Sequence, residues 1–75
     1  MKRVRVVSSS VTSVGYDPAT QTLEVEFAGG SIYRYFDVPE GVHARLIAAD
    51  SKGTFLNVEI KPAFRFARRS RRATT

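Results

Sequence analysis

The sequence predicts an α+β fold in which a small antiparallel sheet of about three strands packs against one main helix. Three observations lead to this prediction. Residues 22–27 alternate apolar and acidic side chains, as a half-buried strand does. A glycine turn then leads into residues 31–36, which are rich in aromatic and β-branched side chains. Residues 39–49 instead repeat their apolar positions with the period of a helix.

Two further strand candidates precede the hairpin. Residues 1–7 alternate basic and apolar side chains and could begin an edge strand, where charge opposes pairing with other chains. Residues 11–16 form the first firm strand, and the broken alternation near Ser13, together with Gly15, indicates a β-bulge. Residues 17–20 form the next turn, since aspartate and proline both favour turn geometry.

The length of the hairpin loop determines where the tyrosines point. A two-residue turn would place Glu24 opposite Tyr35, whereas a three-residue loop at 28–30 places Glu24 opposite Arg34. The longer loop puts opposite charges on the open face and leaves Tyr33 and Tyr35 on the covered face. We predict the three-residue loop, because each complementary cross-strand pair contributes about 0.2–1 kcal/mol.

The main helix is expected over residues 39–49, with Asp37 as the N-cap or Val38 as the boundary. Gly53 is expected to end this segment in a left-handed conformation. Residues 54–60 fit either a short helix or a strand, and we favour a short second helix that Pro62 terminates. The expected core positions of the main helix are Val42, Leu46 and Ala49, helped by Ile47.

Positive charge is concentrated at the C-terminus. The chain carries a net charge of +5, and without the five arginines after residue 64 its basic and acidic residues balance. We therefore divide the chain into a domain, 1–64, and a disordered arginine-rich tail, 65–75. Arginine binds phosphate bidentately and stacks on bases, so this tail is the strongest chemical signal in the sequence. A solvated tail without a specific role is the alternative interpretation.

Composition excludes several kinds of site. The 75 residues suffice for one small domain, and without cysteine the chain has no disulfide or thiolate metal site. His43 is the single histidine and has no recognisable nucleophile motif with it, so neither a metal site nor an enzyme is expected. No apolar run could cross a bilayer and no secretory signal is recognisable. We expect a cytoplasmic protein without cofactor or membrane association.

Two other features have both a functional and a structural interpretation. Tyr33 and Tyr35 could stack on nucleic-acid bases, but the predicted register favours their burial beneath the helix. Ser51-Lys52-Gly53 with Asn57 could bind a phosphate at a helix N-terminus, but a capped turn between two helices is favoured.

Four sequence blocks, in order and spacing, resemble the KTSC family, which is named for a domain at the C-terminus of some lysyl-tRNA synthetases and also occurs as small bacterial and phage proteins. The resemblance covers about residues 8–64, and the arginine run lies outside it. It implies an α+β fold and, through the synthetases, a role in RNA binding. The blocks are Ser9-x-Val11-x-x-Val14-Gly15-Tyr16-Asp17, Leu23-x-Val25-x-Phe27-x-x-Gly30, Tyr33-x-Tyr35-x-x-Val38-Pro39 and Ala49-x-Ser51-Lys52-Gly53-x-Phe55-x-Asn57-x-x-Ile60.

Two functions follow as hypotheses. The first is a small non-enzymatic module that binds RNA, or nucleic acid in general, through its basic termini, with affinity that falls steeply with salt. The second is a protein-interaction module that docks a partner through an edge strand or an exposed Ile32 and Phe36 face, with no nucleic-acid role. The residues expected to contact nucleic acid are Arg65, Arg68, Arg69, Arg71, Arg72, Lys52, Lys61, Tyr33 and Tyr35.

Overall fold

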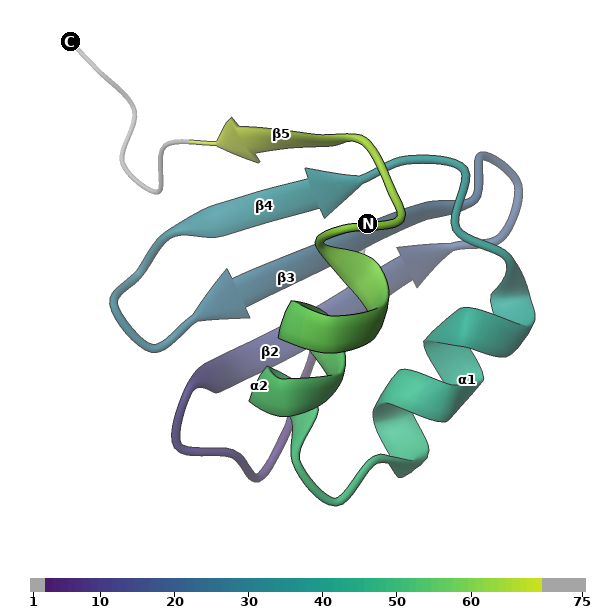
Figure 1. The fold of residues 1–75 in the computed structure, drawn as a ribbon. Coiled ribbons are helices and arrows are strands. Elements are labelled where there is room, and N and C mark those ends of the chain that lie inside the picture. Colours follow the sequence, from purple (N-terminus) through teal and green to yellow (C-terminus); the bar gives the residue numbers. More distant parts are fainter. Residues whose placement is uncertain (1–2, 70–75) are drawn as a thin grey trace, which may run out of the picture.

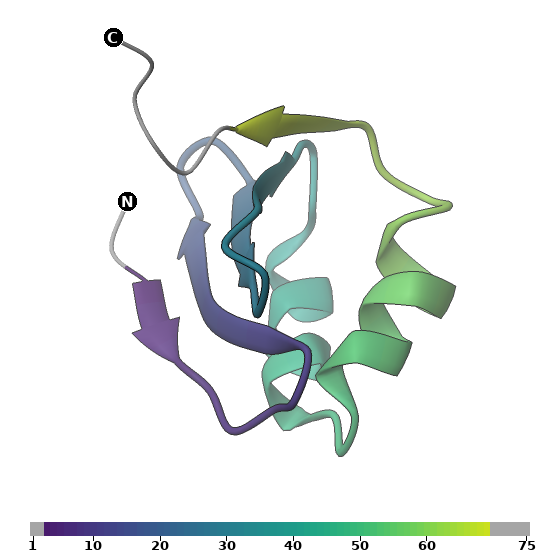
Figure 2. The same cartoon turned by 90° about the vertical axis from the view of Figure 1, so that its left-hand side faces the viewer.

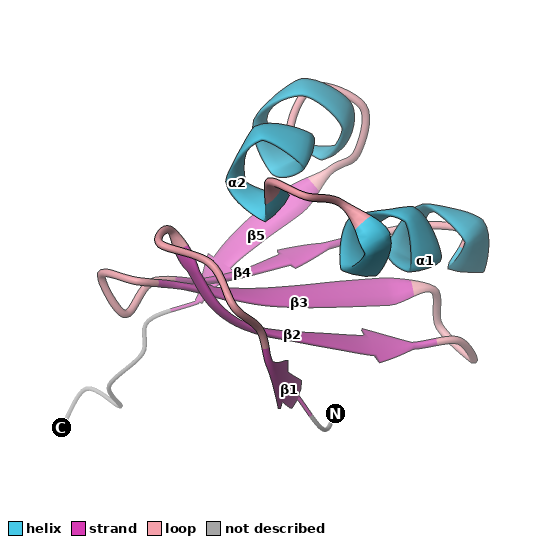
Figure 3. Ribbon diagram, turned by 90° about the horizontal axis from the view of Figure 1, so that it is seen from below, coloured by secondary structure: helices cyan, strands magenta, loops and turns pink. Residues whose placement is uncertain are grey.

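Five strands form one antiparallel sheet in which each strand pairs with its neighbours in the sequence (Figure 1). The computed structural model describes residues 3–69. The strands are β1 Arg3–Arg5, β2 Val11–Asp17, β3 Thr22–Phe27, β4 Ile32–Tyr35 and β5 Phe66–Arg69. The helices are α1 Glu40–Ala48, α2 Lys52–Phe55 and the π-helix η1 Leu56–Ile60. The three helices of the described residues lie on one side of the sheet, and within residues 3–69 the other, open face carries no helix (Figure 3).

The α+β class is confirmed, but the expected number of strands was too small. The short β1 is the edge strand that the basic and apolar alternation suggested. The prediction that residues 65–69 belong to a disordered tail is wrong, because Phe66–Arg69 pairs with β4 as β5. An edge strand needs backbone hydrogen bonds on one side and very little burial, so the scarcity of apolar residues there did not exclude a strand. Residues 70–75 lie outside the described part of the chain.

The predicted hairpin register is confirmed. Cross-strand pairs join Glu24 to Arg34 and Val25 to Tyr33, and the three-residue loop closes with Gly30 at a positive φ of 95°. The Phe27 amide donates to the Ser31 carbonyl at 2.9 Å, which completes the turn. The predicted bulge is also present, since the pairing of β2 with β3 shifts register between residues 11 and 13.

The main helix forms within one residue of its predicted ends, but the residues that cap it are not the expected ones. Pro39 is the N-cap, and Asp37 instead adopts a positive φ of 59°, so Asp37 does not cap the helix. Gly53 lies inside α2 and does not end α1, because α1 already stops at the extended Ala49. A Cβ atom at Gly53 would clash with the Ser10 hydroxyl, so this glycine permits a close approach.

The favoured helical assignment of residues 54–60 is confirmed by α2 and η1. Leu56 and Ile60 of η1 are fully buried, whereas Val58 is 62% exposed. Of the expected α1 core positions, Leu46 is fully buried, but Ile47 is 42% exposed and adds little to the core. The remaining core comes from the covered face of the sheet and from Val38: Val11, Val14, Leu23, Val25 and Tyr35 are all buried.

Tyr35 is fully buried and its hydroxyl has no hydrogen-bond partner among residues 3–69. Burial, with a smaller contribution from Tyr33, raises the pKa of Tyr35 to about 12. We expect Tyr35→Phe to raise the free energy of unfolding by about 1 kcal/mol, because a buried hydroxyl without a partner costs about 1–3 kcal/mol. Chemical denaturation at pH 7 measures this difference, and a variant less stable than the wild type would contradict the account.

The pKa of Tyr35 also sets a pH dependence. A folded pKa of about 12 lies above the ordinary value of 10.0, so the neutral ring stabilises the fold below pH 10 and this stabilisation is lost as the pH rises toward 12. The Tyr35→Phe variant should therefore keep more of its stability than the wild type between pH 10 and 12.

Candidate nucleic-acid interface

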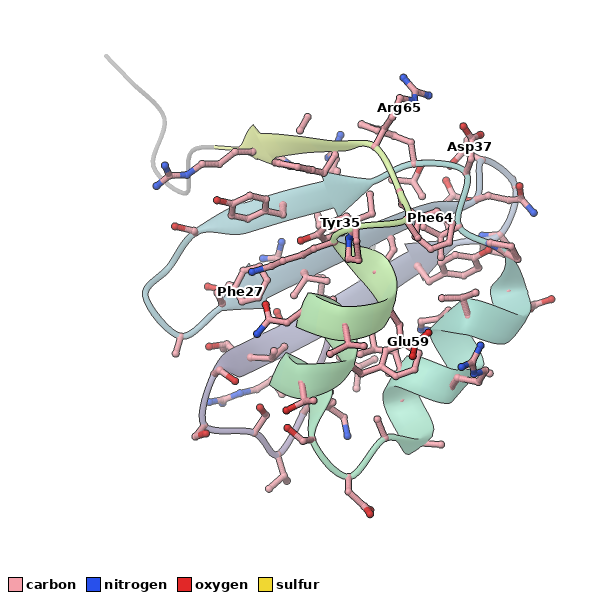
Figure 4. All side chains as sticks on the ribbon, in the orientation of Figure 1. Phe27, Tyr35, Asp37, Glu59, Phe64 and Arg65 are labelled. Carbon is pink, nitrogen blue, oxygen red and sulfur yellow. The ribbon has the colours of Figure 1, made fainter. Side chains whose placement is uncertain are left out.

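Three aromatic rings gather on the covered side of the sheet, toward β5, and we call Phe27, Tyr33 and Phe66 the aromatic patch. The ring centroids of Tyr33 and Phe66 lie 5.5 Å apart, and Phe27 meets Tyr33 edge-on, also at 5.5 Å. Phe66 is 54% exposed, whereas Phe27 and Tyr33 are half-buried. Figure 4 shows Phe27 beside the helical segment rather than beneath it. The patch therefore presents aromatic surface to solvent.

The patch forms because strand side chains alternate between faces. Tyr35 pairs with Phe66, and Tyr33 pairs with Arg68, so these residues share the covered face. The Phe66 ring packs on Tyr35 at a centroid distance of 5.9 Å. In Figure 2 β5 lies at the edge of the sheet, apart from the helices. The Phe66 side chain on this edge strand is only partly covered.

Two cations border the aromatic patch. The Lys61 Nζ lies 5.4 Å from the centroid of the Phe27 ring, a cation–π contact. Arg68 donates from Nη2 to the Ser31 hydroxyl at 3.3 Å. Both side chains are exposed, and within residues 3–69 neither forms an ion pair. Their charges are therefore available to an anionic ligand.

The structure thus brings together three of the residues predicted from the sequence: Tyr33, Lys61 and Arg68. Tyr35 does not belong with them, because its ring is fully buried and cannot stack on a base. Lys52 is also elsewhere: its Nζ donates to the Ala49 carbonyl at 3.0 Å and bridges the turn between α1 and α2.

The phosphate site considered at Ser51-Lys52-Gly53 is not supported. The Ser51 hydroxyl accepts from the Thr54 amide at 3.3 Å and so caps α2 in the way the structural interpretation expected. Asn57 is exposed on η1. The Ser51 hydroxyl and the Lys52 ammonium are thus both engaged within the turn itself.

The arginines after residue 64 separate in space. Arg65 forms an exposed ion pair with Asp37 at 3.3 Å and lies over the Phe36 ring at 5.5 Å (Figure 4). Arg69 lies on the open face of the sheet and reaches Glu24 at 3.4 Å. Arg71 and Arg72 fall outside the described residues.

The surface that the protein-interaction hypothesis proposed is also corrected. Ile32 is only 7% exposed, and Phe36 is half-buried with the Arg65 guanidinium over its ring. These two side chains therefore do not form an exposed apolar face.

Glu24 is the centre of a second charged group, on the open face. Its side chain is 3% exposed, yet it forms ion pairs with Arg3 and Arg34, both at 2.9 Å, and with Arg69. Burial by itself would raise the pKa of Glu24, but hydrogen bonds and charge from Arg34 and Arg3 outweigh burial and hold the pKa below its ordinary value. The carboxylate is therefore ionised at neutral pH.

His43 packs against an aromatic ring. Its ring stacks on Tyr16 with centroids 4.6 Å apart and an interplanar angle of 9°. Burial lowers the pKa of His43, although the Glu40 charge partly opposes this shift. Within residues 3–69 no group of three histidine or acidic residues could hold a metal ion, and no helix there is long and apolar enough to span a membrane.

Sequence reasoning missed Phe27 as a site residue. It paired Glu24 with Arg34 but missed the contacts of Glu24 with Arg3 and Arg69. The alternation of Phe64 and Phe66 between arginines was the available signal for β5, since the same alternation at Arg3-Val4-Arg5 suggested β1. No local signal marks Glu24 as buried, because its partners come from both edge strands.

Comparisons with known proteins place this geometry in a family. A protein of Stutzerimonas stutzeri described as uncharacterized is 53% identical over 62 residues, which is 83% of this chain and 87% of that protein. A lysine–tRNA ligase of Nostoc sp. is 45% identical over 58 residues, 77% of this chain but only 10% of the ligase.

A solved structure gives the same result. The crystal structure of a KTSC domain protein from Yersinia pestis matches with a TM-score of 0.88 at 38% identity, and the match covers 92% of this chain and 97% of that one. The family model described as the KTSC domain matches residues 7–64. The resemblance seen in the sequence blocks is thereby confirmed, and the chain belongs to the KTSC domain family.

Proposed function

We propose that this chain is a non-enzymatic module that binds single-stranded RNA at the aromatic patch. The observation that supports this most is the exposed Phe66 ring, packed on Tyr33 and bordered by Lys61 and Arg68. Unpaired bases stack on aromatic side chains, and neighbouring cations neutralise the phosphates between them. The patch combines both kinds of group within one surface.

The ligand that fits this patch is a single-stranded RNA. Base stacking on a protein ring requires a base that is free of its own helix, which favours single strands over a duplex. The relatives named lysine–tRNA ligases act on a tRNA by name, which supports RNA rather than DNA. Arg71 and Arg72, beyond the described residues, add charge that would strengthen the contact with any polyanion.

The proposal predicts a large loss of affinity for Phe66→Ala. Removing one stacking ring costs about 1–3 kcal/mol, which corresponds to a dissociation constant roughly 5- to 150-fold larger. Fluorescence anisotropy of the full chain with a labelled eight-nucleotide RNA measures this change. Phe66→Tyr keeps a stacking ring and should bind as the wild type does.

Val4→Ala is the matched control for Phe66→Ala. Val4 is an apolar side chain that is 65% exposed on β1, at the opposite edge of the same sheet. It should leave the affinity unchanged. Equal affinities of Phe66→Ala and the wild type would exclude stacking on this patch. If the wild type does not bind RNA at physiological salt, the protein-interaction function becomes the better hypothesis.

A further inference from the structure

The open face carries two rows of side chains that run across the whole sheet. The pairing aligns Arg3, Gly15, Glu24, Arg34 and Ala67 in one row, and Arg5, Ser13, Glu26, Ile32 and Arg69 in the next. Each row thus begins with an arginine on β1 and has a small residue on β2. The absence of a side chain at Gly15 lets Arg3 extend across β2 to Glu24, 2.9 Å away.

Arginine side chains from both edge strands of the sheet reach Glu24. Arg3 comes from β1 and Arg69 from β5, and these are the two edge strands, while Arg34 comes from the adjacent β4. One buried carboxylate therefore holds three guanidinium groups over the middle of the sheet. Because a guanidinium has five N–H donors, three of them cannot all be satisfied by one carboxylate.

An open hollow of about 520 Å³ lies over this cluster. The Arg3 and Arg69 side chains line the hollow and are 28% and 57% exposed, so their remaining donors can reach a ligand there. Arg34 is 41% exposed but does not line the hollow. The four arginines of the two rows outnumber Glu24 and Glu26, so the surface is positive. The hollow is lined by Arg3, Arg5, Thr12, Ser13, Glu24, Glu26 and Arg69.

We propose that this open arginine face binds phosphate groups of a nucleic-acid strand, and that Glu24 is a positioning residue that fixes the separation of its three arginines. The proposal rests on the proposed function for the identity of the strand. A pre-organised guanidinium loses less side-chain entropy when it binds phosphate, so an acidic residue at the centre can strengthen binding of an anion.

The edge strand β5 connects this face to the aromatic patch. Consecutive strand residues point to opposite faces, so Arg68 lies beside Tyr33 while Arg69 lies on the open face. A strand that stacks its bases on the patch and passes over β5 would meet the arginine face with its next phosphates.

A base-free ligand tests the arginine face alone. We would add inorganic tripolyphosphate to the full chain and follow the arginine Nε–Hε resonances by NMR. Saturable shifts at Arg3, Arg5 and Arg69, which line the hollow, would support the proposal, and loss of the Arg3 and Arg69 shifts in Arg5→Gln would confirm the site. Shifts confined to Arg65 and Arg68, or no shifts, would overturn it. Tripolyphosphate has no base to stack, so the result of this experiment does not depend on whether RNA binds the aromatic patch.

The role of Glu24 is tested by Glu24→Gln, for which a positioning role and simple charge predict opposite changes in affinity for an anion. Glu24→Gln adds one positive charge, which would tighten binding if charge alone mattered. We expect at least threefold weaker tripolyphosphate binding, because the arginines lose their common anchor. Glu59→Gln makes the same charge change at an exposed pair with Arg45 and should bind as tightly as the wild type or tighter. Tighter binding by both variants would overturn the positioning role.

A second variant keeps Glu24, so that a folding defect of Glu24→Gln cannot be mistaken for a loss of binding. Arg69→Gln leaves Glu24 with Arg3 and Arg34, so the sheet retains its central pairs. Removing one cation that neutralises a phosphate of a single strand lowers the slope of log affinity against log salt by about 0.7. We expect that decrease for Arg69→Gln with a twelve-nucleotide RNA, against no change for Arg45→Gln on α1. Equal slopes for Arg69→Gln and Arg45→Gln would overturn the proposal for the arginine face. If only Phe66→Ala loses binding, the proposed function at the aromatic patch still stands.

Discussion

Ending the chain at Phe64 is expected to lower the free energy of unfolding by about 2–4 kcal/mol. The truncation removes β5, whose backbone pairs with all four residues of β4. Each net backbone hydrogen bond contributes about 0.5–1.5 kcal/mol. It also removes the Phe66 ring, which packs on Tyr33 and Tyr35. A domain of this size has little stability in reserve, so the loss should be obvious.

Thermal unfolding followed by circular dichroism measures the effect of this truncation. A loss of 2 kcal/mol or more corresponds to a midpoint lower by at least about 8 °C for a domain of this length. A chain that ends at Arg69 is the control, because it keeps β5 and removes six residues without a large apolar side chain. Equal midpoints for the chains ending at 64 and 69 would show that β5 adds nothing to the fold.

Replacing Glu24 by glutamine is expected to cost about 1–3 kcal/mol of stability at pH 7. Breaking a buried ion pair is expensive because it leaves charge without a partner. The cost is moderated here because Arg34 and Arg69 are partly exposed and can turn to water. Glu59→Gln removes an exposed pair at 3.8 Å and should change the stability by less than about 0.5 kcal/mol.

The difference between the wild type and Glu24→Gln should depend on pH in a defined direction. The pKa of Glu24 in the folded protein lies below its ordinary value of 4.5, so the ionised carboxylate stabilises the fold above that pH. This stabilisation is lost as the pH falls through the lowered pKa. Urea denaturation at pH 7 and below pH 4 should therefore show the two proteins converging in acid. A constant difference would mean that the Glu24 charge is not responsible.

The hairpin and its register were predictable because local chemistry and the fold agree there. Only one register pairs Glu24 with Arg34 and leaves both tyrosines on the covered face. A slip of one residue would have moved every side chain to the opposite face. The burial of Tyr35 followed directly from that register, and so did the place of Tyr33 in the aromatic patch.

The rest could not be predicted because it depends on contacts between distant segments. Lys61 meets Phe27 across 34 positions of the sequence, and Arg69 meets Glu24 across 45. Neither pair leaves a pattern with a local period. The run of arginines indicated positive charge but not the face of the sheet on which each side chain lies. In β5, Arg68 and Arg69 lie on opposite faces of the sheet.

The central claim, that the aromatic patch binds single-stranded RNA, is tested most directly by mapping where RNA contacts the full chain. We would titrate an eight-nucleotide RNA and record the backbone amide shifts by NMR at physiological salt. We expect the largest shifts on β5, on Tyr33 and Phe27, and on Lys61. An absence of shifts, or shifts confined to α1, would contradict the claim.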